Sequence, residues 1–302
     1  MTLGPFRVRM LVANLKRGGY DTTTRFHDHD KLEQMLSVVD QAPHIIVLSE
    51  CTHYGSYHSQ PLLEVVHRLG RLWGTTTDTD GRRIPSVPYM PFISTVPGSI
   101  NVPGLLVDTR YVIPQHWHGL DGRKVHANTL VARINGERIR LKSVHWNGST
   151  GPVGFDLQAD QDAQLASEAA IIAGDFNATS SAAGDTMPAD WEQHCRDHGQ
   201  PWKLSQKGVR TATGWRINTG SYDRFLEHGW WDAGTAAGDF TPTINPAGGA
   251  AAQMRNDRIA ISNRAPVTLV PGSYRVHVPD HGRIVSDHRA LSCELDIPAA
   301  AG

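Results

Sequence analysis

Cysteine is scarce in this sequence, and its distribution argues against two classes of protein. Among 302 residues there are three cysteines, Cys51, Cys195 and Cys293, and no two of them form a Cys-x-x-Cys pair. A small and widely spaced set is typical of a reducing compartment, and it fits neither a disulfide framework nor a zinc ribbon. We therefore expect a cytoplasmic location.

Long apolar runs are missing as well. No segment stays apolar for the roughly 18 residues that a membrane helix needs, and the first ten residues do not combine a basic region with a long apolar core, so neither a membrane span nor a secretory signal is predicted. With 39% hydrophobic and 20% charged residues, the chain is long enough to bury a large core. No repeat or linker divides it, and we expect one domain over residues 1–302.

An excess of basic charge is also absent. The formal net charge is −1, whereas dedicated nucleic-acid binders are usually strongly basic because phosphate contacts supply most of their affinity. Net charge therefore gives no support to a nucleic-acid substrate. It does not exclude one either, since a local basic rim can coexist with a neutral whole, and no partner protein is evident.

The pattern of apolar residues predicts alternating strands and helices. Asn135-Gly136 separates two alternating runs and is a strong hairpin signal, because both turn positions favour positive φ. The segment 184–250 is harder to interpret. Within it we expect a helix at 188–198. In the rest of the chain the periodicity predicts strands at 6–13, 45–48, 124–134, 137–146, 171–173, 257–262 and 288–296, and helices at 30–41, 61–72 and 156–169.

Polar residues stand at the ends of these predicted strands. In α/β proteins, loops at one edge of a sheet converge on a shared crevice, so the residues at these ends are expected to form one pocket. They are Asn14, Glu50, His145, Asn147, Asp175, Asn177, Asp257, Asp287 and His288.

Such a pocket suits a hard divalent cation. Mg²⁺ prefers carboxylate and amide oxygens, which Glu50 could supply together with Asn14 or Asp287. A histidine beside an aspartate is oriented by it and favoured in its charged form. The sequence has no Gly-x-Ser-x-Gly, P-loop, dinucleotide or His-Glu-x-x-His motif that would indicate a competing chemistry.

In this order the motifs resemble the endonuclease/exonuclease/phosphatase superfamily, whose members are deoxyribonuclease I-like. The matching pieces are Asn14, Leu-Ser-Glu50, Ser-Val-His145, Gly-Asp175-Phe-Asn177, Arg-Asn-Asp257-Arg-Ile and Ser-Asp287-His288. The resemblance implies a four-layer α/β sandwich of two mixed β-sheets flanked by helices. It also implies a metal-dependent hydrolase of phosphate esters that uses Mg²⁺, with Mn²⁺ as an alternative.

The resemblance also implies roles for these residues. Glu50, Asn14 and Asp287 would hold the metal. Asp175 would orient or deprotonate the attacking water, with Asn177 fixing Asp175 or the phosphate. Asp257 would hold the ring of His288; His145 and His288 would bind the phosphoryl oxygens, and either Asp175 or His288 could be the base. Apart from the resemblance, Asn147 and Trp146 are expected to line the substrate site because they directly follow His145.

Several alternatives stay open at this point. The leading hypothesis is hydrolysis of a nucleic-acid or nucleotide-like phosphodiester. The others are a small phosphorylated metabolite, an inositol phosphate or a lipid headgroup as substrate, or a repurposed binding or biosynthetic protein. Asp280-His281 is an alternative to Asp287-His288 as the last motif. We prefer Asp287-His288 because Ser286 precedes it. The cluster at 26–30 fits a helix-capping loop better than a second metal site.

Overall fold

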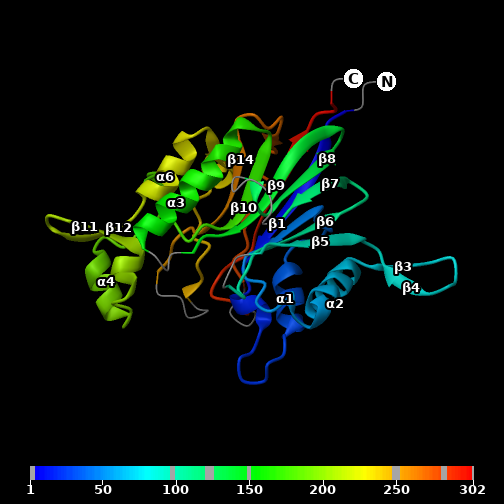
Figure 1. Ribbon diagram of the computed structural model, residues 1–302, viewed down its shortest axis with the longest axis horizontal. Coiled ribbons are helices and arrows are strands. Elements are labelled where there is room, and N and C mark those ends of the chain that lie inside the picture. The colour runs from blue at the N-terminus through cyan, green and yellow to red at the C-terminus, as the bar shows by residue number, and fades with distance from the viewer. Residues whose placement is uncertain are drawn as a thin grey trace.

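The computed structural model describes residues 4–95, 99–119, 126–147, 151–246, 252–279 and 284–300. Two large mixed β-sheets pack face to face, and helices cover their outer faces (Figure 1). The predicted fold class is confirmed. No helix in the described ranges combines the length and the apolar character that crossing a bilayer requires.

The first sheet has the order β15-β17-β1-β2-β6-β5, with β16 also paired to β17. Neighbours β1 and β2 run parallel, whereas β17 is antiparallel to β1. The strands are β1 (Phe6–Ala13), β2 (Ile45–Leu48), β5 (Tyr89–Ile93), β6 (Gly104–Asp108), β15 (Thr268–Leu269), β16 (Arg275–Val276) and β17 (Leu291–Ile297).

The second sheet has the order β13-β14-β10-β9-β8-β7. Here β9 and β10 are parallel and β14 is antiparallel to β10. The strands are β7 (Val112–His118), β8 (Thr129–Ile134), β9 (Glu137–His145), β10 (Ala170–Asp175), β13 (Trp230–Asp232) and β14 (Asp257–Ser262). The predicted Asn135-Gly136 turn joins β8 to β9, and both residues have positive φ.

Alternation along each strand divides its side chains between two layers. Val8 and Met10 of β1 join the core between the sheets, whereas Leu11 packs beneath helices α1 (His29–Leu36) and α2 (Ser56–Leu72). The other sheet packs in the same way against α3 (Pro152–Ala163), the 3₁₀ turn η4 (Gln164–Ser167) and α6 (Gly220–Glu227).

Smaller elements extend from this sandwich. The hairpin β3–β4 projects on one side, and α4 and the hairpin β11–β12 lie on the other (Figure 1). Their bounds, with those of the remaining short helices, are η1 (Lys16–Gly19), β3 (Thr75–Thr77), β4 (Arg83–Pro85), α4 (Trp191–Asp197), α5 (Lys203–Lys207), β11 (Gly208–Thr211), β12 (Gly214–Ile217) and α7 (Ala233–Ala237).

Most predicted elements are present, but several of their boundaries were wrong. Helix α1 covers His29–Leu36 instead of 30–41, and the carboxylate of Asp28 caps it by accepting from the Lys31 amide. The predicted helix at 156–169 is a shorter α-helix that continues as a 3₁₀ turn, and the last strand begins at Leu291 instead of 288.

A buried ion network anchors β14 below the edge of the sheet. Arg255 and Arg258 both pair with Asp185 and Asp232, and all four side chains are 0–1% exposed. The Arg258 guanidinium also lies 4.3 Å from the centre of the Tyr222 ring. Burial alone raises the pKa of Asp232, but the two guanidinium groups lower it to about 2. The network therefore fixes the strand that begins at the neighbouring residue, Asp257.

Candidate active site

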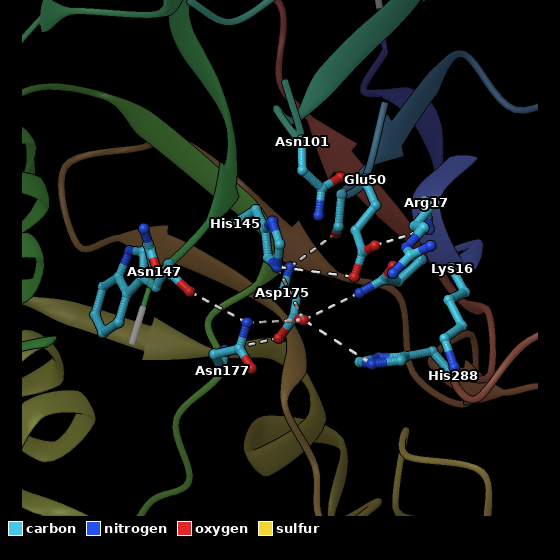
Figure 2. Close-up of polar contacts among 12 residues, drawn as sticks. Lys16, Arg17, Glu50, Asn101, His145, Asn147, Asp175, Asn177 and His288 are labelled. Carbon is cyan, nitrogen blue, oxygen red and sulfur yellow. Dashed lines mark hydrogen bonds and ion pairs between the residues drawn. The ribbon is translucent and has the colours of Figure 1, made fainter. Parts of the chain in front are cut away.

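The predicted strand-end residues meet at one edge of the sandwich (Figure 2). β9 and β10 are parallel, and β14 is antiparallel to β10, so the register places Asp175 between His145 and Asp257. The first sheet contributes Asn14 after β1 and Glu50 after β2. The structure thus brings together side chains that are up to 274 positions apart, from Asn14 to His288.

Asp175 is the centre of this group and is 1% exposed. Its carboxylate accepts hydrogen bonds from Asn14 Nδ2 at 3.0 Å, from the Asn177 amide at 2.7 Å and from Asn177 Nδ2 at 3.1 Å. Its own amide donates to Ser49 Oγ at 2.9 Å. Because the two sheets both hold Asp175, its position is fixed relative to each of them.

Two imidazoles face this carboxylate. His145 Nε2 lies 3.8 Å from Asp175 Oδ2 and 3.9 Å from Glu50 Oε1, and His288 Nε2 lies 4.0 Å from Asp175 Oδ2. Asp257 Oδ2 is bonded to His288 Nδ1 at 2.7 Å. Burial alone lowers the pKa of His288, but the Asp257 carboxylate, helped by Asp175, raises it to about 10. A charged imidazole is thereby held beside the site.

The turn after β10 has a demanding backbone. Gly174 has φ +134°, and a Cβ there would lie 2.1 Å from the Val144 carbonyl oxygen, so no larger residue fits. Asn177 has φ 50°, a left-handed conformation that asparagine tolerates better than most residues. Its Nδ2 also donates to the Trp146 carbonyl at 3.1 Å, which fixes the orientation of the amide.

A sequence model of the endonuclease/exonuclease/phosphatase family matches residues 11–288, a range that contains every site residue from Asn14 to His288. This chain belongs to the endonuclease/exonuclease/phosphatase family. It is a metal-dependent hydrolase of phosphate esters. A search of curated protein sequences finds no match.

Solved structures with the same fold cover almost the whole chain. The AP endonuclease from Archaeoglobus fulgidus is 14% identical, with a TM-score of 0.56 over 95% of this chain and 98% of its own. D. rerio TDP2 complexed with a single-strand DNA product is 17% identical, with a TM-score of 0.54 over 96% and 98%. The endonuclease domain of TRAS1, a telomere-specific non-LTR retrotransposon, is 16% identical, with a TM-score of 0.53 over 97% and 99%.

The donor atoms at the site fit the divalent cation that this family uses. Asn14 Oδ1 is buried and has no hydrogen-bond partner among the described residues, which is costly unless a ligand satisfies it. Glu50 is partly exposed and accepts from the Arg17 amide, and Asp287 lies 3.8 Å from the ammonium of the adjacent Lys16. These oxygens suit a hard ion such as Mg²⁺.

A second group of donors lies close to the first. Ligand atoms of Asp175, Asp257 and His288 all fall within 4.8 Å of one another. His288 and Asp257 are already hydrogen-bonded to each other. We therefore interpret these three residues as a charged imidazole held by carboxylates, and not as a metal site. The predicted set of Asn14, Glu50 and Asp287 stays our preferred metal position.

Trp146 is not a substrate-binding side chain, contrary to prediction. It is 1% exposed, its ring packs edge-on against Phe176 and Phe225, and its Nε1 donates to Asp162. Successive strand residues point to opposite faces, so His145 faces the site while Trp146 faces the helices. Asn147, in contrast, is exposed at the rim (Figure 2), and its backbone is held by Gln158.

Replacing Trp146 by Phe is expected to affect stability and not substrate binding. The variant keeps an aromatic ring but leaves a buried Asp162 oxygen without its donor, which costs about 1–3 kcal/mol. Urea denaturation measures the loss, and steady-state kinetics should give an unchanged KM. A raised KM with unchanged stability would return Trp146 to the substrate site.

The sequence analysis missed two contributors to the site. Ser49 accepts from the Asp175 amide, and Lys207 donates to Asn177. The alternative pair Asp280-His281 lies outside the described residues. In the cluster at 26–30, Asp28 caps α1 and His27 Nε2 bonds the Thr52 carbonyl oxygen, which agrees with the predicted capping role.

Proposed function

We propose that this hydrolase is a Mg²⁺-dependent phosphodiesterase that cleaves a nucleic-acid or nucleotide-like diester by in-line attack of water. The observation that carries the proposal is the position of Asp175 between two imidazoles, with the Glu50 carboxylate beside one of them. This edge of the sandwich then offers a base, two donors for phosphoryl oxygens and a set of metal-binding oxygens.

Each residue has a distinct task in this mechanism. Asp175, held by Asn14 and Asn177, orients the water and accepts its proton, since a base must sit within hydrogen-bond reach of the proton it removes. His145 and the charged His288 donate to the phosphoryl oxygens, where negative charge grows during attack. Asn14, Glu50 and Asp287 would hold Mg²⁺, which would supply Lewis-acid stabilisation of that charge.

A nucleic-acid or nucleotide-like substrate is supported by local features, not by the net charge. Lys16 and Arg17 follow Asn14 after a single residue and lie on the rim near Glu50 (Figure 2), so basic groups are available for neighbouring phosphates. Among the structures with this fold, one is named an AP endonuclease and another holds a single-strand DNA product.

The test is Mg²⁺-dependent release from a panel of a generic phosphodiester, a generic phosphomonoester, single- and double-stranded DNA, RNA and inositol phosphates. Removing the metal with EDTA should stop turnover, and added Mg²⁺ should restore it. Glu50→Ala should lower kcat by at least about 10²-fold, because it removes a charged metal ligand. Glu64→Ala, at an exposed carboxylate on α2, is the matched control and should keep full activity.

Each outcome of this panel is informative. Full Mg²⁺-dependent activity of Glu50→Ala would disprove the assignment of Glu50 as a metal ligand. Preference for a monoester or an inositol phosphate would replace the nucleic-acid substrate by a small phosphorylated metabolite. A wild-type chain without turnover on any member would contradict the proposed reaction.

A further inference from the structure

Lys207 brings an ammonium group into the site from an element that the predicted motifs do not include. It is the last residue of α5, and its Nζ donates to Asn177 Oδ1 at 2.9 Å. The backbone around it is tightly held: the Asn218 amide donates to the Lys207 carbonyl, and a Cβ on Gly208 would lie 2.5 Å from the Leu204 carbonyl oxygen. The position of the ammonium is therefore built into the fold.

Most of the hydrogen-bonding capacity of this ammonium is unused. An ammonium has three N–H groups, and the Asn177 amide takes one of them. Across the described parts of the chain, the Lys207 ammonium has no second hydrogen-bond partner, and no carboxylate lies within 4.0 Å of it. The residue is partly buried, and even partial withdrawal of a cation from water is costly when no counter-ion accompanies it. Burial lowers the pKa of Lys207 to about 8, although the charges of Asp175 and Asp257 oppose this.

The carboxylates nearby are already engaged. Asp175 is bonded by Asn14 and Asn177, and Asp257 is bonded by His288. The unsatisfied ammonium thus lies beside Asn177, which contacts the same Asp175 carboxylate that both imidazoles face. The ammonium is thus linked through Asn177 to the carboxylate that His145 and His288 approach from other elements. An anion beside the ammonium would fill the empty donor positions of Lys207.

We propose that Lys207 is a phosphate-binding residue of this site, whose ammonium donates to a non-bridging oxygen of the scissile phosphate while it stays bonded to Asn177. This inference deepens the proposed function and rests on it. The ammonium then acts twice: it stabilises charge on the phosphoryl group directly, and it fixes the Asn177 amide so that Nδ2 faces Asp175.

The test uses the full chain with Mg²⁺ and two variants of this residue. Lys207→Met removes charge and donors, and Lys207→Gln keeps a donor for Asn177 but removes the charge. Lys203→Met, one turn earlier on the same helix, is the control. Calorimetry measures the Kd for inorganic phosphate, and kinetics on the preferred diester measure kcat and KM separately. Thermal melting shows whether each variant folds.

Both Lys207 variants should bind inorganic phosphate about 10-fold more weakly and lose about 10²-fold in kcat, as expected for a donor to developing charge. Lys207→Arg should recover most of the phosphate affinity, and Lys203→Met should match the wild type. A Lys207→Gln variant with wild-type phosphate affinity and kcat would overturn the inference. Lys207-dependent phosphate binding in a chain that hydrolyses no diester would uphold it and contradict the proposed reaction.

Discussion

Replacing Asp175 by Asn is expected to lower kcat by about 10³-fold, since a base and its positioning network are lost together. Asparagine has the same shape, but one of its terminal atoms donates hydrogen bonds. That NH₂ group would face donors that now bond the carboxylate, namely Asn14 Nδ2 and the amide and Nδ2 of Asn177. Single-turnover kinetics with saturating Mg²⁺ measure the loss.

The matched control for this variant is Asp160→Asn. Asp160 is half exposed on α3, where it forms only a loose ion pair with Arg224, so its replacement should leave kcat unchanged. A kcat for Asp175→Asn within a few-fold of the wild type would exclude Asp175 as the base. The base would then be sought in the two imidazoles that face Asp175, those of His145 and His288.

Replacing Arg258 by Met is expected to lower the free energy of unfolding by about 3–5 kcal/mol, the usual cost of breaking a buried ion pair from one side. The guanidinium bonds Asp185 and approaches Asp232, both of which are excluded from water. Removing it leaves two buried carboxylates with Arg255 alone. Urea denaturation of the metal-free chain measures the change without any contribution from bound ligand.

The same variant should unfold in acid at a higher pH. Because the folded-state pKa of Asp232 is depressed to about 2, its contribution to stability is present above its unfolded value and is lost as pH falls through about 2. Without Arg258 the folded-state pKa rises, and the loss begins sooner. Arg224→Met, at an exposed pair with Asp156, should change stability by no more than about 1 kcal/mol. Equal effects of the two variants would contradict a structural role for the buried network.

The site could be predicted from the sequence largely because its residues follow recognisable strands. An apolar run such as 45–48 that ends in Ser-Glu50 leaves few places for the carboxylate except the edge of a sheet. The Gly-Asp175-Phe-Asn177 turn is similarly marked, since Gly174 and Asn177 occupy positive φ. Parallel pairing of β9 with β10 then places His145 beside Asp175.

The parts that were missed lack such local signals. Lys207 lies in a five-residue helix within the segment that showed no clear periodicity, and its contact with Asn177 depends on tertiary packing. Trp146 was placed on the wrong face although strand alternation with His145 contains the information. The buried pairs of Arg255 and Arg258 could not be foreseen, because arginine in an apolar strand gives no indication of its partners.

The pairing of β17 with β1 has a consequence for the order in which the site can form during translation. Strand β1 pairs with β17 from Phe6 with Ile297 to Val12 with Leu291, and Asp287 and His288 stand just before that strand. A ribosome-bound nascent chain that has not yet extruded these residues holds Asn14, Glu50 and Asp175 without the imidazole that Asp257 orients. The site therefore becomes complete only after the segment that precedes β17 has left the ribosome.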